Sequence, residues 1–397
     1  MNQARFLTWI FLLALVLSGC SDTREPEQPQ KVPRIVYEVY PNDWYVKQEK
    51  LWKKEIEKNP QNAEAWYNYY NAVRYARYEE TIETKSKKEK LAKIIEEMGK
   101  AIPNTYEYLL LKSWNACDIH DISVAQEAYK LRPDRPDTYY TFISHYEVYG
   151  KADKMREFCW KLYRSKDIAP WLLNYNYNVL MSTEKDAILI TNGDNDTYPC
   201  WVLQQALGIR PDVTVVNISL SPTKDYLQNK LQKRGIRIDI PAIKQKLKSE
   251  NTFDRGNFIR EVCREINDSY PEVPIYFAFT VYPDFYKSIK DDLYVVGLAY
   301  RYSPERIDNL AYLKKNLEQH FRLDYLTNDW YNENALGKNI RQHMHMNYVV
   351  PMIMLAEHYH ISGEAEAAEK WKTLALKVAE ETGKKAEILE DLKKRGM

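Results

Sequence analysis

The pattern of apolar and polar positions from about residue 43 to 183 is that of helices throughout, with glycine rare and proline at helix starts. Pro103, Pro136 and Pro170 recur at spacings of 33 and 34 residues. Tetratricopeptide repeats have a period of about 34 residues. Gly150 falls where such repeats turn between helices. The pattern therefore predicts a degenerate tetratricopeptide-like array over residues 43–183.

The pattern changes near residue 186 to short, fully apolar runs. Residues 187–191 and 213–218 are two such runs, and an amphipathic stretch, 198–207, lies between them. Strand, loop, helix and strand in this order indicate a βαβ unit with a parallel-type sheet covered on both faces. Further strands are expected at 236–240, 274–281 and 293–300, and helices at 223–234, 241–249, 255–268 and 284–290. We expect an α/β domain over residues 184–303.

From about residue 304 the chain returns to a helical pattern. Residues 344–360 and 364–381 are separated by Ile361-Ser362-Gly363, which is typical of a helix-turn-helix repeat, and residues 385–394 would cap it. Residues 304–397 are thus predicted to form a C-terminal helical repeat and cap. The expected fold is an α/β domain with a parallel-type sheet, flanked by all-α tetratricopeptide-like helical repeats.

The N-terminus predicts an export signal. A basic start precedes an apolar run, residues 6–17, of about a dozen residues, whereas a membrane span needs roughly 20. The run ends in Leu17-Ser18-Gly19-Cys20, which resembles a lipobox. We expect residues 1–19 to be a lipoprotein signal peptide, Cys20 to be lipidated, and residues 20–42 to be an acidic, proline-containing tether. The alternative is a secretory signal with a chance cysteine.

The residues after Cys20 indicate where the lipoprotein resides. Ser21, in place of the Asp that retains lipoproteins in the inner membrane, favours the outer membrane. The polar, acidic segment 21–27 resembles the surface-export signal of Bacteroidota lipoproteins. The predicted location is the cell-surface leaflet of the outer membrane, with the periplasmic leaflet as the alternative.

Composition narrows the classes of partner. The chain has 57 basic and 56 acidic residues with no large basic block, which argues against nucleic acid as a partner. The remaining cysteines form no CxxC pair, so zinc is not expected and their disulfide state is left open; they are Cys117, Cys159, Cys200 and Cys263. The 32 tyrosines suit helical-repeat cores and binding grooves alike.

The loop after the first predicted strand is the best candidate site. Its candidate residues are Asn192, Asp194, Asn195, Asp196 and Thr197. Open α/β sheets bind ligands at this edge, and two carboxylates suit a divalent cation or sugar hydroxyls better than a phosphate. The competing interpretation is structural, because Asp, Asn and Thr are ordinary turn and helix-cap residues. Structure, ligand or metal binding, and catalysis are all kept open, in that order.

Other groups are weaker candidates. His343 and His345, like His358 and His360, are two residues apart and do not share a helix face. Cys200 has no histidine near it in sequence, so a buried structural thiol is the preferred interpretation. No nucleotide-binding or hydrolase motif is present, and no cofactor is expected. The aromatic cluster Trp66, Tyr67, Tyr69 and Tyr70 predicts inter-repeat core, with part of it free to line a groove.

The middle of the chain resembles the soluble C-terminal region of a family of multi-pass, protein O-mannosyltransferase-like membrane proteins common in Bacteroidota. The resemblance covers roughly residues 184–380 and is carried by residues 185–199, 208–213, 216–220, 274–278 and 297–301. It implies a shared fold of the soluble region. It implies no catalytic residue here, because that family's catalysis is thought to lie in its multi-pass portion.

These features predict a non-enzymatic outer-membrane lipoprotein that acts as a scaffold or accessory subunit of an outer-membrane protein complex. Its expected partners are an integral outer-membrane protein or other envelope lipoproteins. One alternative is a glycan-binding or glycosylation-accessory protein. Another is an enzyme that uses Asp194 and Asp196.

Overall fold

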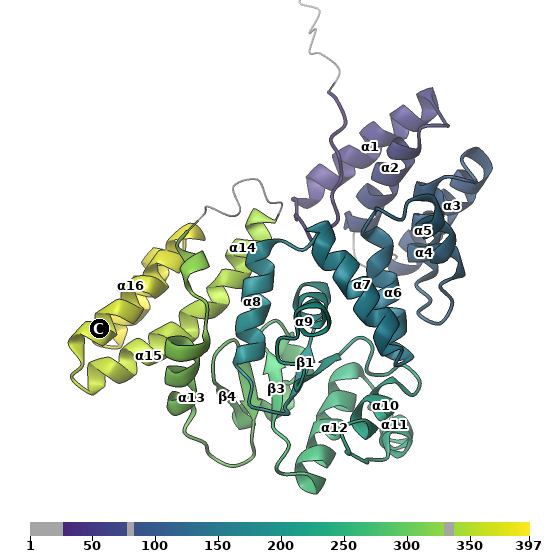
Figure 1. The fold of residues 1–397 in the computed structure, drawn as a ribbon. Coiled ribbons are helices and arrows are strands. Elements are labelled where there is room, and N and C mark those ends of the chain that lie inside the picture. Colours follow the sequence, from purple (N-terminus) through teal and green to yellow (C-terminus); the bar gives the residue numbers. More distant parts are fainter. Residues whose placement is uncertain (1–26, 78–82, 329–336) are drawn as a thin grey trace, which may run out of the picture.

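The computed structural model describes residues 27–77, 83–328 and 337–397. The predicted signal peptide 1–19, Cys20 and the first part of the tether lie outside the described residues. A small sheet occupies the centre of the molecule, with helices α1–α7 on one side and α13–α17 on the other (Figure 1). The predicted class, an α/β unit flanked by helical repeats, is confirmed.

Among the described residues, eight helices precede the sheet. They are α1 Asn42–Lys58, α2 Ala63–Tyr75, α3 Glu83–Ala101, α4 Tyr106–Ala116, α5 Ser123–Leu131, α6 Asp137–Val148, α7 Ala152–Ser165 and α8 Pro170–Met181. Consecutive helices α1 and α2, α4 and α5, and α6 and α7 pack against each other. The assignment of these pairs to the tetratricopeptide class stays a prediction.

The regularly spaced prolines mark every second helix. Pro103 lies shortly before α4, Pro136 is the N-cap residue of α6, and Pro170 is the first residue of α8. Proline suits the start of a helix because its missing N–H would have no intrahelical partner there. The proline spacing therefore reports the distance between the first helices of successive pairs.

The predicted tether, residues 20–42, is wrong over its second half. Val32 is fully buried, and its backbone N–H donates to Asn68 Oδ1 at 2.7 Å. Trp52 Nε1 donates to the Gln30 carbonyl at 2.8 Å. Residues 28–34 form no regular element and residues 35–37 make a turn, in which Tyr37 N donates to the Arg34 carbonyl at 2.9 Å. Side chains of α1 and α2 supply hydrogen bonds that this irregular backbone lacks. We call residues 28–40 the N-terminal segment.

The sheet has the order β2-β1-β3-β5-β4. Its strands are β1 Ile188–Thr191, β2 Thr214–Asn217, β3 Ile275–Ala278, β4 Leu293–Val295 and β5 Ala299–Tyr302. Strands β2, β1 and β3 are parallel and every residue in them is buried, as expected for a sheet covered on both faces. Strands β5 and β4 are antiparallel to their neighbours and form one edge.

Two strand predictions are wrong. The run 236–240 forms no strand, because Asp239 caps a helix there through Ala242 N, at 2.9 Å, and Ile240 begins α11. The run 293–300 is divided between β4 and β5 by a tight turn at Gly297, whose φ is 154°. A Cβ at Gly297 would lie 2.6 Å from Ser182 Oγ, so only glycine fits this approach.

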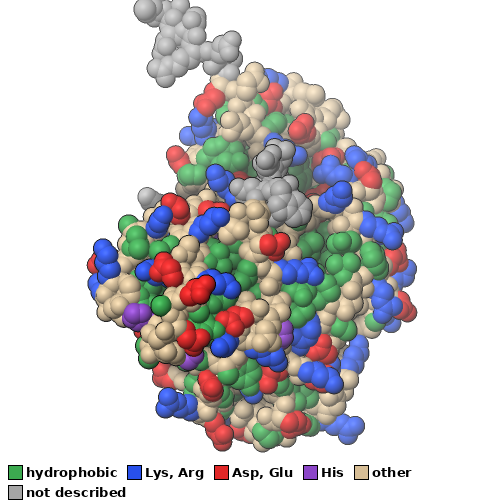
Figure 2. Space-filling view, turned by 60° about the vertical axis from the view of Figure 1, so that its left-hand side comes forward, with side chains coloured by type: hydrophobic (Ala, Val, Ile, Leu, Met, Phe, Trp, Pro, Cys, Tyr) green, Lys and Arg blue, Asp and Glu red, His purple; other side chains and the backbone are tan. Residues whose placement is uncertain are grey.

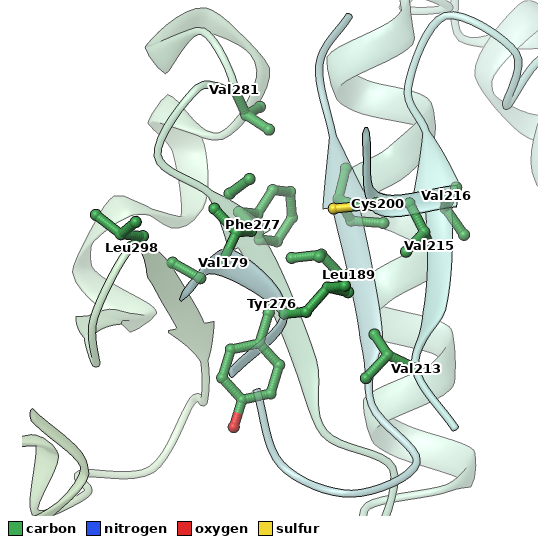
Figure 3. Close-up of a cluster of buried hydrophobic side chains, with 14 of the residues drawn as sticks. Val179, Leu189, Cys200, Val213, Val215, Val216, Tyr276, Phe277, Val281 and Leu298 are labelled. Atoms are coloured by element: carbon green, nitrogen blue, oxygen red, sulfur yellow. The ribbon is translucent and has the colours of Figure 1, made fainter. Parts of the chain in front are cut away.

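Three of the four predicted connecting helices are close to those observed, whereas the helix predicted at 284–290 is wrong, because two 3₁₀ turns with a break at Ile289 lie there. The observed connecting helices are α9 Asp194–Leu207, α10 Tyr226–Gln232, α11 Ile240–Ser249 and α12 Arg255–Ser269, followed by short 3₁₀ turns at Pro283–Phe285 and Lys287–Asp292. Figure 3 shows side chains of β1, β2 and β3 meeting Val179 of α8 and Cys200 of α9 in the buried core. This core continues from Ile122 to Leu392, whereas a separate core joins Val32 to α1–α4.

The C-terminal helices complete the larger core. They are α13 Asn309–Lys315, α14 Lys338–His345, α15 Val349–Ile361, α16 Ala365–Glu381 and α17 Lys385–Lys394. Helices α15 and α16 form an antiparallel pair around Trp371, which is buried. Basic and acidic side chains are interspersed over the face shown in Figure 2. In the described parts of the chain, no helix is both long and apolar enough to cross a membrane.

His345, at the end of α14, is buried where α8 meets the C-terminal helices. It is 3 % exposed, and its ring lies edge-on to Trp171 and Tyr325. Burial, reinforced by the positive charge of Arg341, lowers the pKa of His345 from 6.5 to about 3. The folded protein therefore holds this imidazole neutral across the acidic range in which an unfolded chain protonates it.

We predict that His345 makes the fold acid-sensitive. The unfolded chain binds this proton below pH 6.5 and the folded chain only near pH 3, so stability is lost as pH falls through that window. From pH 7 to pH 5 this histidine should remove about 2 kcal/mol of unfolding free energy. Urea unfolding at pH 7 and at pH 5 measures this difference in unfolding free energy.

The His345→Gln variant should lose less stability than the wild type over the same pH step. The exposed neighbour His343 offers a matched control, and His343→Gln should behave as wild type. An equal pH dependence of wild type and His345→Gln would refute the assignment.

Candidate functional site

The structure places the candidate loop between β1 and α9, and it turns Asp196 inward. Asp196 is 2 % exposed and accepts hydrogen bonds from Asn192 N at 2.6 Å, Gly193 N at 2.8 Å and Thr280 Oγ1 at 2.5 Å. Burial raises the pKa of this carboxyl, and these hydrogen bonds oppose the rise. Asp196 thus satisfies the free N–H groups before α9 and ties them to the chain after β3.

Thr197 is also used by the fold. Its Oγ1 lies 2.8 Å from Thr191 Oγ1 and accepts from Asn217 Nδ2 at 2.9 Å, so it joins β1, α9 and β2. Asp194, in contrast, is exposed, and Asn195 is half-buried. The loop therefore has an inner side that holds the sheet edge together and an outer side that is free to meet a ligand.

The outer side of the loop opens into a pocket of about 420 Å³, which we call the junction pocket. Its wall is formed by the N-terminal segment and by the starts of three helices, α6, α8 and α9. Lining residues include Val32, Arg34, Tyr37, Tyr67, Asp137, Tyr140, Asp167, Trp171, Asp194, Asn195 and Tyr198. Val32 belongs to the smaller core and Trp171 to the larger one, so the pocket lies on the seam between the two.

Arg34 is the central cation of the junction pocket. Its guanidinium lies 4.6 Å from the ring centre of Tyr140 and 5.3 Å from that of Trp114, within cation–π range. Its one hydrogen bond to a described residue is a long one, 3.4 Å, to Tyr37 Oη, and it forms no ion pair with them. Aromatic faces therefore position Arg34 while most of its five N–H donors stay uncommitted.

Two of the three carboxylates in the wall are already satisfied. Asp167 accepts from Tyr37 Oη at 2.5 Å and from Tyr140 Oη at 2.6 Å. Burial raises the pKa of both phenols, which stay protonated and act as donors. Asp137 accepts from Tyr106 Oη at 3.0 Å and pairs with a neighbouring arginine.

Asp194 is the exception among these carboxylates. It has neither a hydrogen bond nor an ion pair to any other described residue. Burial lowers the pKa of the Arg34 guanidinium, but the nearby phenols of Tyr37 and Tyr140, together with Asp137 and, least, Asp194, raise it; Arg34 and Asp194 nevertheless form no ion pair. The pocket therefore presents Arg34 as a cation held by aromatic rings, two exposed lysines, Lys31 and Lys166, that form no ion pair with a described residue, and Asp194 as its uncommitted anion.

The predicted aromatic cluster divides between core and pocket. Trp66, Tyr69 and Tyr70 are buried in the smaller core. Tyr67, on the same helix, is half-buried and lines the junction pocket. The cluster thus contributes both to the core and to the pocket wall, because four side chains within five consecutive helical positions cannot all face one side.

The remaining candidates are structural. Cys200 is fully buried, its Sγ lies 3.4 Å from Asn176 Oδ1, and burial raises its pKa well above the ordinary value, as a structural thiol requires. Cys117, Cys159 and Cys263 are also free thiols. Within the described ranges, no three His, Cys, Asp or Glu side chains are grouped to hold a metal ion.

Sequence reasoning missed Arg34, Asp167 and Trp171. Arg34 lies in the segment predicted as a tether, and its aromatic partners Trp114 and Tyr140 are distant in sequence. The available signal was the run Val32 to Tyr37, which is too apolar for a solvated linker.

A family model described as TMEM260-associated domain 2 matches residues 172–252. This stretch runs from α8 through β1, α9 and β2 to just beyond α11. It overlaps the first part of the region that resembles the mannosyltransferase-like membrane family, and the rest of that resemblance stays a prediction. The match includes the α9 wall of the junction pocket but not the N-terminal segment or α6. No curated protein matches the chain.

We predict that substitutions of the two aspartates of the loop change the unfolding free energy to very different extents. Asp196→Ala should lower the unfolding free energy by about 2–3 kcal/mol, because it leaves buried N–H donors without an acceptor. Asp194→Asn, at an exposed position, should change it by less than about 0.5 kcal/mol. Chemical unfolding of both variants measures the contrast. Equal losses would show that the loop has no inner and outer side.

Proposed function

We propose that this chain is a non-enzymatic accessory protein of an outer-membrane complex, held at the membrane by a lipid on Cys20, and that it recognises a partner or ligand through the junction pocket. The observation that carries the proposal is the pair of uncommitted charges, Arg34 and Asp194, in a preformed pocket. Preformed concave sites with a few placed polar groups are typical of ligand recognition.

The arrangement of the acidic residues favours binding over catalysis. An enzyme based on the candidate loop would use Asp194 and Asp196 together. Asp196 is instead buried and bound to two backbone N–H groups and a threonine hydroxyl. A general acid or base must reach the proton that it transfers. Asp194 alone faces the pocket, where it can position a ligand.

A second candidate function, glycan binding, is favoured by the pocket lining. Tyr67 and Tyr198 contribute aromatic rings, and Asp194 and Asn195 contribute groups that bind hydroxyls. Aromatic rings with a polar handle and side chains that accept hydrogen bonds suit a saccharide. Glycan binding and the accessory role would use the same pocket and differ only in the molecule that the pocket binds.

The accessory role predicts a stoichiometric partner. Tagged full-length protein, purified from gently solubilised outer membranes, should retain an integral membrane protein in roughly equal amount, identified by mass spectrometry. Arg34→Ala should reduce this recovery if the partner occupies the pocket. Arg322→Ala is the matched control, since Arg322 lies 3.8 Å from the ring centre of Tyr177 and outside the pocket wall.

A protein recovered alone would refute the accessory role. Retention of the partner by the Arg34→Ala variant would keep that role and move the contact surface elsewhere on the helices.

A further inference from the structure

The geometry points to a ligand class for the junction pocket: a small organic carboxylate whose neighbouring group, a hydroxyl or an ammonium, donates hydrogen bonds. This inference rests on the proposal that the pocket is a binding site. It adds the chemistry that the site selects.

Arg34 supplies the site for the carboxylate. Its planar fork of N–H donors matches the two oxygens of a carboxylate, and such charge-assisted pairs are stronger than neutral hydrogen bonds. The ring of Tyr140 at 4.6 Å and that of Trp114 at 5.3 Å restrain the guanidinium before any ligand arrives. A cation held in this way and not paired with a carboxylate of the described chain is suited to an external anion.

The start of α8 reinforces this preference. Helices α6, α8 and α9, of 12, 12 and 14 residues, all begin at the pocket wall. Helix α8 has no acidic residue in its first turn, so the partial positive charge of its N-terminus favours a nearby anion, whereas acidic side chains in the first turns of α6 and α9 offset that charge. Asp167 and Asp137 are compensated by the phenols and the arginine that they bind, so they oppose this field less than free carboxylates would.

Asp194 favours a ligand that carries a hydrogen-bond donor beside its carboxylate. A purely anionic molecule would be repelled by this exposed carboxylate, which belongs to the same pocket as Arg34. A donor group beside the ligand's carboxylate turns the repulsion into a hydrogen bond. The volume of about 420 Å³ is that of a site for an organic molecule and exceeds the needs of a bare inorganic anion.

Two sources carry this chemistry. A uronic acid joins a carboxylate to sugar hydroxyls, and an α-amino acid joins it to an ammonium group. The test is isothermal titration of the purified full-length protein in detergent with glucuronate and with L-leucine. Glucose, which lacks the carboxylate, and acetate, which lacks the donor, serve as reference ligands.

We expect one of the two probes to bind saturably, and glucose and acetate to bind at least about ten-fold more weakly. Arg34→Gln and Asp194→Asn should each weaken the bound probe by about ten-fold or more. Their matched controls, Arg322→Gln and Asp284→Asn, lie outside the pocket wall and should bind as wild type. The probe that binds identifies the source.

Absence of binding by both probes overturns the inference, as does equal binding of glucose and glucuronate or wild-type affinity in Arg34→Gln. If Arg34→Gln fails to fold, Arg34→Lys replaces it, because lysine keeps the charge, loses the fork, and should still weaken binding. A probe that binds while no membrane partner is recovered would refute the accessory role alone. A recovered partner without probe binding would refute the ligand class alone.

Discussion

Two buried asparagines on α8 hold the parts of this molecule in register. Asn176 Nδ2 donates to the Asn195 carbonyl at 2.8 Å, at the start of α9. Asn178 donates to the Arg322 carbonyl at 2.7 Å, accepts from Arg322 N at 2.8 Å and donates to Tyr348 Oη at 2.7 Å. Both asparagines are fully buried, and a buried amide that loses its partners is costly. Helix α8 can therefore pack only where the loop before α9 and the chain before α14 are both in place.

The junction pocket is a consequence of this arrangement. Once α8 is fixed against α9, its first turn lies beside that of α9, and α6 begins at the same place. The N-terminal segment then closes the remaining side, held to α2 by Asn68 and to the start of α8 by the bond from Tyr37 to Asp167. At the start of α8, whose first turn has no acidic side chain, the helix N-terminus gives the pocket a local preference for anions.

The same loop shows how environment separates two chemically identical groups. Asp196, buried behind the loop, has become part of the backbone hydrogen-bonding of α9 and the sheet edge. Asp194, two residues earlier, is exposed and lines the pocket. One turn of helix places them on different sides, since neighbouring positions separated by two residues do not face the same way. Within one short motif, Asp196 thus supports the fold, whereas Asp194 lines the pocket.

Local pattern was enough to predict much of the architecture. The apolar runs at 187–191 and 213–218 predicted β1 and β2, and prolines at regular spacing marked the helix starts, because side-chain periodicity and proline geometry act over a few residues. The strand prediction at 236–240 was wrong, because a short apolar run does not distinguish a strand from a buried connection. Ile236 and Ile238 are buried there without joining the sheet.

The site itself depended on tertiary structure. The sequence alone determined that the loop 192–197 follows a strand and opens a helix, and that its residues are fit both to cap and to bind. Only the folded chain decided that Asp196 caps and that Asp194 faces a pocket. Only the folded chain brought Arg34 between Trp114 and Tyr140, since contacts between residues so distant in sequence leave no periodic trace. A pocket assembled from five separate segments is therefore determined by packing, because no local pattern records which segments meet.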